Sequence, residues 1–323
     1  MKYSRIRQAI GERPWAMRQA ELDAMLEIIE LRAAGVPFSE QESGELIAAA
    51  RAAREEVEAS AQSAARSAGG SIAILPLFGV LIPRATTMSQ LSGGTSLEAW
   101  GQKFDELVAN SAVQQILLLV DSPGGSADLV AETAAKVAAS KKPVVALAST
   151  MAASAAYWIA SQAAEFDVTT SGEVGSIGVV AVHDDVSQMN EKLGVKPTYV
   201  TAGKFKAEFN QDSPLSEDAE AELQRRVDDV YDMFTADVAK GRRVTKAMAS
   251  GPEFGQGRML EAKRAVAHGM ADRVSTLEQT LERMGERKAS IRGRKRAELP
   301  AAGQTAEIAS SLRQAAATVK EIS

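Results

Sequence analysis

Short apolar segments alternate with helix-forming segments between residues 71 and 240, and this alternation constrains the fold more than any other feature. Residues 116–120 and 143–148 are apolar throughout, which is typical of strands buried on both faces of a parallel sheet. Further strands are expected at residues 71–82, 166–169, 177–182 and 197–200. Helices are expected at residues 95–109, 127–139, 153–163, 186–193 and 216–240. The pattern predicts an α/β fold with right-handed crossovers.

The two ends of the chain differ from this central region. Residues 1–70 are polar and helical in character, with expected helices at 17–34 and 40–67, and we expect them to form a helical N-terminal arm. Helix-forming segments continue to about residue 284. Residues 285–323 combine a basic stretch, residues 287–296, with a polar tail rich in alanine. Within the first strand, Pro76 predicts a sheet edge or a bulge because proline cannot donate a ladder hydrogen bond.

Composition excludes several kinds of site. The 323 residues are 45% hydrophobic, so the chain can bury a sizeable core. It has no cysteine, which excludes disulfides, thiol catalysis and Cys-ligated metals. With only two histidines, His183 and His268, we expect no metal site and no cofactor.

Charge and hydropathy bear on partners and location. A net charge of -5 gives no general reason to bind nucleic acid, and the basic stretch 287–296 is the one candidate for such binding. The chain has neither a signal-peptide pattern at its start nor an apolar run long enough for a membrane helix. We therefore expect a cytoplasmic protein without a membrane anchor.

Two short motifs follow expected strands, where α/β sheets bind ligands. The first is DSPGGS, residues 121–126, whose paired glycines allow a sharp turn that exposes backbone amides. The second is a run of small residues around Ser154, near the start of the next helix. The amides of Gly125 and Ala155 would form an oxyanion hole beside the Ser154 hydroxyl.

A serine hydroxyl needs a base to act as a nucleophile. His183 is one candidate and is followed by two aspartates. Lys206 is the other, because a lysine serves as base when burial lowers its pKa, and Phe205 and Phe209 lie close enough in sequence to bury it. The residues alone leave both bases open, with a slight preference for lysine.

Four motifs in order resemble the S49 serine peptidases, the signal-peptide-peptidase-A family. They are DSPGG at 121–125, MAASAAYWIAS at 151–161, GSIGV at 175–179 and AGKFKAEFN at 202–210. The resemblance covers about residues 71–275 and implies a catalytic domain over 71–284. It implies a fold similar to the Clp protease and crotonase superfamily, with a ββα superhelix core, a helical N-terminal arm and C-terminal helices.

The resemblance also implies roles for single residues. Ser154 falls on the family's nucleophile and Lys206 on its general base, which together form a Ser-Lys dyad without a cofactor. Gly125 falls on the oxyanion position, and Lys204 falls where the family varies. Alanines at 155 and 156 stand where many relatives have two glycines, but alanine keeps the backbone amide, so the oxyanion hole survives.

Residues 12–17, ERPWAM, followed by the helical arm, resemble the start of the phage and prophage head-maturation proteases in this family. This implies an endopeptidase that cleaves scaffold and capsid proteins, and that self-associates with the helices after residue 216 as candidate interfaces. One alternative is a soluble signal-peptide-peptidase homologue that degrades peptides. Another, from a different class, is a catalytically silent crotonase-like binding or scaffold protein.

Overall fold

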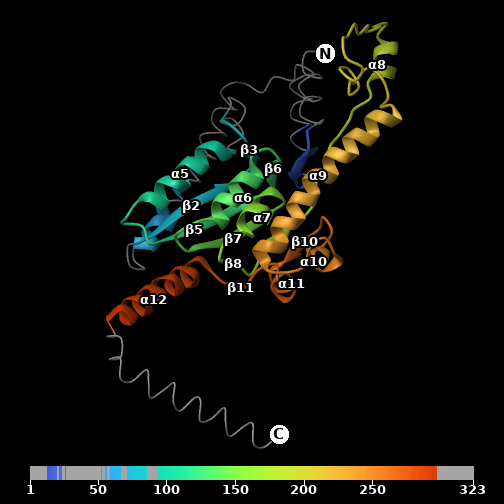
Figure 1. Ribbon diagram of the computed structural model, residues 1–323. Helices are drawn as coiled ribbons and strands as arrows, with labels where there is room; N and C mark the ends of the chain where they lie inside the picture. The colour runs from blue at the N-terminus through green and yellow to red at the C-terminus, as the bar shows by residue number, and fades with distance from the viewer. Residues whose placement is uncertain are drawn as a thin grey trace, which may run out of the picture. The chain divides into compact units, whose positions relative to one another are not determined.

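The computed structural model in Figure 1 describes residues 13–19, 22–23, 26, 52, 55–56, 59–66, 71–85 and 94–296, with side chains up to residue 286. The chain forms two compact units, residues 1–281 and 282–323. The boundaries expected at residues 70 and 284 stay predictions. The expected tail lies outside the described residues, as do most of the expected helices at 17–34 and 40–67.

A seven-stranded sheet lies at the centre of the first unit (Figure 1). Its strand order is β10-β9-β7-β5-β2, and β8 and β11 continue from the first half of β7. The strands β2, β5, β7 and β8 are parallel, as the alternation predicts. The strands of this sheet are β2 (Ile72–Phe78), β5 (Gln115–Ser122), β7 (Val144–Ala153), β8 (Glu165–Val168), β9 (Glu173–Gly175), β10 (Met259–Glu261) and β11 (Arg273–Val274). The predicted α/β class is confirmed.

Helices pack against this sheet, and their buried residues join its core. They are α5 (Leu97–Ala109), α6 (Val130–Ala138), α7 (Ala155–Ala160), α9 (Glu217–Arg242), α10 (Lys246–Ala249), the 3-10 helix η1 (Pro252–Phe254) and α11 (Ala262–Ala267). Two further helices are α8 (Ser187–Lys192) and α12 (Leu277–Arg296). The Ser96 and Ser216 hydroxyls cap α5 and α9 by accepting main-chain N–H groups. Pro76 lies in the edge strand β2, as its chemistry predicts.

A second, four-stranded sheet has the order β1-β6-β3-β4. It consists of β1 (Trp15–Met17), β6 (Gly124–Ser126), β3 (Leu81–Ile82) and β4 (Thr95–Ser96). The expected strand at 71–82 is thus divided between two sheets, because Gly79 turns the chain with a φ of 63°. The sequence also placed Met17 in a helix, whereas it ends a strand that pairs with β6.

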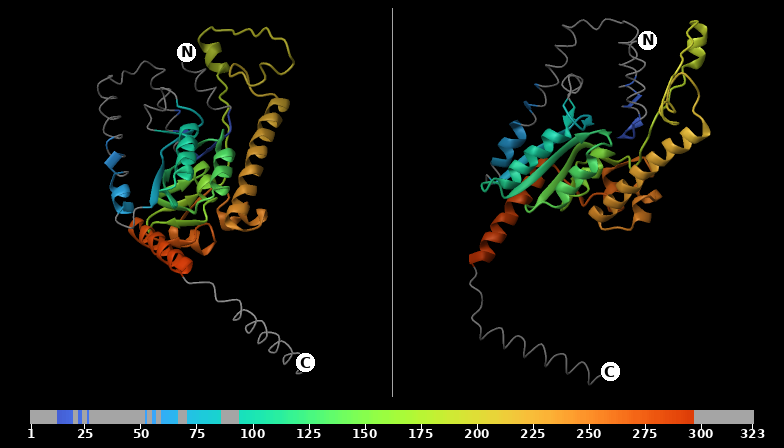
Figure 2. Two further views of the ribbon diagram at one scale, coloured as in Figure 1. Left: turned by 60° about the vertical axis from the view of Figure 1, so that its left-hand side comes forward. Right: turned by 45° about the horizontal axis from the view of Figure 1, so that its top comes forward.

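Two strand predictions are wrong. Residues 177–182 contain only an isolated bridge between Val180 and Trp15. Residues 197–200 form no strand and are exposed, since they belong to the segment around α8, which extends away from the sheet (Figures 1 and 2). A short apolar run becomes a strand only where a partner strand meets it, and residues 197–200 have none among the described residues.

Candidate active site

Ser154 occupies a sharp turn between β7 and α7. Its backbone has φ 52° and ψ −118°, a conformation that L residues rarely adopt. Holding a residue there costs on the order of 1–3 kcal/mol, and such strain concentrates at functional sites. A serine on a strained strand-to-helix turn is the arrangement by which nucleophilic hydroxyls are presented in other hydrolases. This turn, which we call the Ser154 elbow, therefore marks Ser154 as a candidate nucleophile.

The small residues around Ser154 are explained by close packing. Its neighbours Ala152, Ala153, Ala155 and Ala156 have no exposed surface, and the Ser154 side chain is also fully buried. The Ser154 N–H donates to the Gly175 carbonyl at 2.7 Å, and its hydroxyl lies 3.4 Å from the Gly178 carbonyl. Larger side chains at these positions would push the elbow out of register.

The six-residue helix α7 is held in place by its two aromatic residues. The Tyr157 hydroxyl donates to the Met270 carbonyl at 3.0 Å, and burial raises the pKa of this phenol. Trp158 stacks on Phe234 of α9 with ring centroids 4.6 Å apart. The Trp158 indole N–H donates to Asp237 at 2.8 Å. These contacts fix the start of α7, and with it the position of Ser154.

The glycine pair of the DSPGGS motif lies directly against Ser154. Gly124 has φ +98°, and a Cβ added to it would lie 3.0 Å from the Ser154 Cβ. A Cβ on Gly125 would lie 1.8 Å from the Leu81 carbonyl oxygen, so neither position admits a side chain. Ser122, which the sequence analysis did not single out, supports the turn because its hydroxyl accepts the Gly124 N–H at 3.2 Å. The structure thus brings Ser154, Gly125 and Ala155 together.

The glycine turn, whose amides were expected to face a ligand, is covered by other strands of the same chain. Residues 124–126 form the strand β6, and both glycines are buried because β1 and β3 flank them. Residues Trp15–Met17 therefore belong to the surroundings of the candidate site. The similarity of residues 12–17 to the phage proteases was the only sequence signal for this segment, and it gave no location.

Lys206 lies in a different environment. It sits in a series of turns after α8, where its N–H donates to the Gly203 carbonyl at 3.2 Å, and its side chain is exposed. Phe205 is 51% exposed and does not bury Lys206 as expected. Within the described part of the chain, the Lys206 ammonium makes no hydrogen bond to Ser154. Lys204 lies 3.9 Å from the Asp218 carboxylate.

His183 is also not joined to Ser154. Its Nε2 lies 3.4 Å from the Ser213 carbonyl oxygen, and its Nδ1 is buried without a hydrogen-bond partner among the described residues. Asp185, which a Ser-His-Asp arrangement would use, accepts the N–H of Ser187 at the start of α8. Neither candidate base therefore contacts the nucleophile in this structure.

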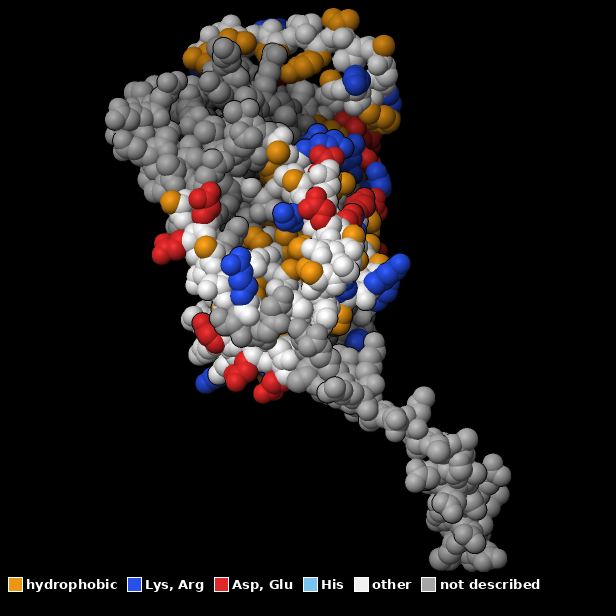
Figure 3. All heavy atoms as spheres, turned by 90° about the vertical axis from the view of Figure 1, so that its left-hand side faces the viewer, with side chains coloured by type: hydrophobic (Ala, Val, Ile, Leu, Met, Phe, Trp, Pro, Cys, Tyr) orange, Lys and Arg blue, Asp and Glu red, His pale blue; other side chains and the backbone are white. Residues whose placement is uncertain are grey.

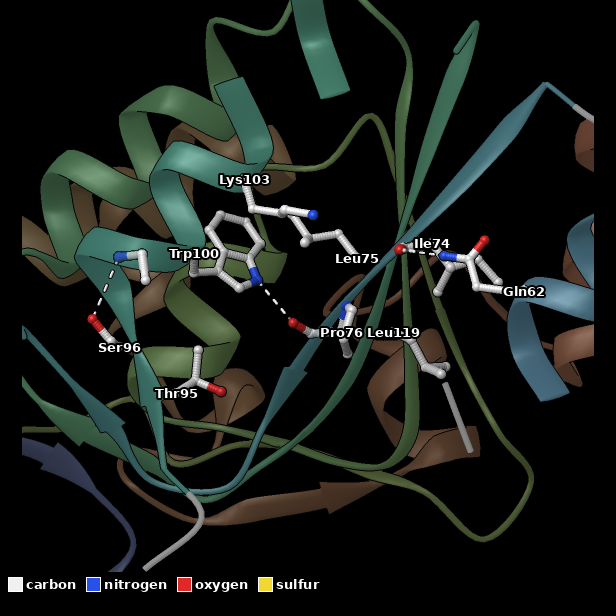
Figure 4. Close-up of a pocket in the computed structure, with 10 residues that line it drawn as sticks. Gln62, Ile74, Leu75, Pro76, Thr95, Ser96, Trp100, Lys103 and Leu119 are labelled. Carbon is white, nitrogen blue, oxygen red and sulfur yellow. Dashed lines mark hydrogen bonds between the residues drawn. The ribbon is translucent and has the colours of Figure 1, made fainter. Parts of the chain in front are cut away.

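A pocket of about 390 Å³ lies elsewhere, between β2 and α5 (Figure 4). Trp100 donates its indole N–H to the Pro76 carbonyl at 2.8 Å along one wall. Gln62 donates to the Ile74 carbonyl at 2.9 Å on the other side. None of the site residues discussed above lines this pocket, so it is separate from the candidate active site.

Comparison with known proteins finds a family match for part of the chain. Residues 136–291 match Peptidase family S49. This part of the chain is an S49 peptidase domain. It contains Ser154 and Lys206, whereas the glycine pair precedes the matched residues. Among the described residues, no helix has both the length and the apolar character needed to cross a bilayer.

Several curated proteins are similar to this chain. The head-tail preconnector protein GP5 of Enterobacteria phage P21 is 31% identical over 203 residues, which are 62% of this chain and 40% of that protein. The capsid assembly protease C of Escherichia phage lambda is 34% identical over 170 residues, 52% of this chain and 39% of that protein. The putative signal peptide peptidase SppA of Enterococcus faecium is 32% identical over 183 residues, 55% and 52% of the two chains. The chain thus spans about two fifths to one half of these relatives.

Among solved structures, a serine-to-alanine mutant of the membrane-bound stomatin-specific protease 1510-N is similar with a TM-score of 0.39 and 15% identity. The similar region covers 63% of this chain and 79% of that one.

Proposed function

We propose that this S49 chain is a serine endopeptidase in which Ser154 is the nucleophile and Lys206 the general base. The observation that carries the proposal is the strained, buried Ser154 elbow packed against the glycine pair. The Ser154 oxygen attacks a peptide carbonyl while the amides of Gly125 and Ala155 stabilise the developing oxyanion. Lys206, when neutral, takes the hydroxyl proton and passes it to the leaving amine. Water then hydrolyses the acyl-enzyme ester.

Lys206 must approach Ser154 for this chemistry, either within one chain or from a second copy. Support for self-association comes from the segment that carries Lys206. Of eight exposed large hydrophobic side chains in the described residues, six lie between residues 189 and 205. They are Met189, Leu193, Val195, Tyr199, Val200 and Phe205. Clustered exposed apolar side chains mark contact surfaces, so this segment is a better candidate interface than the helices after residue 216.

A mixing experiment tests where the dyad forms. Ser154→Ala and Lys206→Ala are each expected to be inactive alone. Activity recovered on mixing the two purified variants would place Ser154 and Lys206 of one site on different copies. An inactive mixture, together with a monomer by light scattering at micromolar concentration, would favour closure of residues 183–215 within one chain.

For the substrate, we propose scaffold and capsid proteins of an assembling phage or prophage head, in the host cytoplasm or the procapsid. The identities to the two phage proteins and the ERPWAM segment support this assignment. Co-expression with neighbouring capsid and scaffold genes, followed by mass analysis of their termini, tests it. New termini that disappear with Ser154→Ala are the expected result. Cleavage of general peptides but not of these proteins would favour a signal-peptide-peptidase-like enzyme instead.

The catalytically silent rival predicts no chemistry at Ser154. Its test is labelling with a serine-reactive fluorophosphonate, with Ser154→Ala as the control.

Nucleic-acid binding through residues 287–296 stays a prediction, because their side chains lie outside those described. On the face shown in Figure 3, acidic and basic side chains of the described residues are interspersed, which gives that face no continuous basic patch.

A further inference from the structure

The strand β1 lies beside the glycine turn of the candidate active site, where it is paired on both edges. On one edge it runs antiparallel to β6, with Ala16 opposite Gly125. On the other edge, Trp15 and Val180 exchange main-chain hydrogen bonds of 2.8 and 3.0 Å. A segment held between two stretches of backbone in this way has the geometry of a bound extended peptide. In Figure 1, β1 is the dark blue arrow close to the label β6.

The hydrogen-bond pattern places one carbonyl of β1 at the proposed oxyanion hole. The Arg18 N–H donates to the Pro123 carbonyl at 3.0 Å, and the Ala127 N–H donates to the Pro14 carbonyl at 3.2 Å. Hydrogen-bonded pairs alternate along an antiparallel ladder, so the pair midway between these two, Ala16 and Gly125, is also a hydrogen-bonded pair. The Gly125 amide, proposed to bind the oxyanion, therefore faces the Ala16 carbonyl.

The position of Gly124 brings the same carbonyl to the nucleophile. A Cβ added at Gly124 would lie 2.2 Å from the Ala16 carbonyl oxygen and 3.0 Å from the Ser154 Cβ. The Ala16 carbonyl and Ser154 are thus neighbours across one glycine. With the segment in place, the Ser154 side chain has no exposed surface, and no other peptide can reach it.

Side-chain burial holds the segment there. Ala16 is fully buried, and Trp15 and Met17 are only 6% and 4% exposed. Trp15 and Met17 form an apolar cluster with Leu22 and Leu26, against which Val80, Val180 and Val182 pack. Because the segment is part of the same chain, it also competes at the high effective concentration of a tethered ligand.

We propose that residues 13–18 are a built-in occupant of the peptide-binding groove, which a polypeptide substrate must displace before Ser154 can act. This inference rests on the proposed function, since it takes the groove beside Ser154 to be the substrate site. It names a regulatory step for that site: the enzyme is blocked by its own N-terminal segment until the segment leaves.

A reversible disulfide lock tests the proposal on the full chain. Trp15 and Ser126 are paired residues, and the ladder alternation makes them a non-hydrogen-bonded pair, whose close Cα atoms suit a disulfide. The chain has no cysteine, so Trp15→Cys with Ser126→Cys allows only this bond within one chain. We expect the oxidised variant to hydrolyse casein slower than the reduced one by on the order of tenfold or more. Each single cysteine variant, treated in the same way, is the control and should show no redox dependence.

A binding readout separates this inference from the proposed function. The probe is a fluorescein-labelled peptide with the sequence of residues 13–18. Its binding to the double-cysteine variant is measured by fluorescence anisotropy. If the peptide binds to the reduced protein but not to the oxidised protein, residues 13–18 occupy the groove, whether or not casein is hydrolysed. A lack of casein hydrolysis would count only against the proposed peptidase activity. Equal rates of casein hydrolysis by both redox forms would contradict the proposal that residues 13–18 block the groove, but would support the peptidase activity. Removal of residues 1–16 from wild type but not from Ser154→Ala would overturn that proposal too, because the segment would then be a substrate.

Discussion

The proposed nucleophile and the proposed base lie in two regions of opposite character. Ser154 and the glycine pair lie in the interior, held by strands β6 and β7 and by the anchored helix α7. Lys206 lies on an exposed segment, residues 191–206, in which every residue is exposed. The proposed oxyanion side of the site is therefore preformed, whereas Lys206 must move to reach Ser154. For the proposed peptidase, the position of Lys206 would control activity.

Ser154→Ala gives the largest expected effect, because it removes the nucleophile from the interior region. We expect hydrolysis of casein to fall by on the order of 10,000-fold or more. The unfolding midpoint should change little, since only one buried oxygen with a 3.4 Å contact is lost. Rates with purified protein and circular dichroism melts check both parts. Retained cleavage would remove Ser154 from the mechanism.

Lys206→Ala tests the exposed region. Loss of a general base typically costs about 100- to 10,000-fold in rate, and stability should not change because the side chain is exposed. Lys204→Ala is the matched control, with the same charge in the same series of turns, and should retain most activity. His183→Ala should also retain it. If the His183→Ala variant is inactive and the Lys206→Ala variant is active, His183 and not Lys206 is the general base.

A pair of glycines with nearly equal φ values contrasts the two regions. Gly124 and Gly203 have φ values of +98° and +99°, so alanine is strained at both. At Gly203 the nearest atom to an added Cβ is the Lys206 Cβ at 4.0 Å, whereas at Gly124 the Ala16 carbonyl oxygen is at 2.2 Å. We expect Gly124→Ala to cost about 1–3 kcal/mol more in unfolding free energy than Gly203→Ala, because it also overpacks the interior. Urea titrations of both variants measure this, and equal costs would contradict the packing at Gly124.

The smallest expected effect concerns acid stability. Burial opposes ionisation of Asp272, but hydrogen bonds from Arg242 and the Phe166 amide outweigh it and lower the pKa of this carboxyl. A carboxylate whose pKa is lowered in the folded state stabilises the protein at pH values above its unfolded-state pKa of about 3.9. This stabilisation is lost as the pH falls through the folded-state pKa. Asp272→Asn should therefore weaken the dependence of stability on pH below about pH 4. Asp218→Asn, which removes the exposed partner of Lys204, should leave that dependence unchanged, and melts from pH 2 to 7 compare the two.

The sequence predicted the elements whose signals are local. Apolar runs located β5 and β7, helical periodicity located α9, and small residues after a strand singled out Ser154. Such features depend on neighbours within a few residues, so one segment contains all the information needed. The family motifs added an expected role for each site residue, and each of these roles stays a prediction.

What the tertiary structure decided depends on residues far apart in the chain. Ala16 meets Gly125 across more than one hundred positions, and no local pattern around Trp15–Met17 predicts a strand, since three residues carry too little periodicity. The positive φ of Ser154, 52°, at the junction of β7 and α7 has no local sequence signal, because serine does not favour it. Phe205 and Phe209 were expected to bury Lys206, but α8 and the loop after it extend away from the sheet, and Phe205 is 51% exposed with the Lys204 ammonium 4.5 Å from its ring centroid. Sequence determined which residues are candidates for the chemistry, and packing between distant segments decided which of them meet.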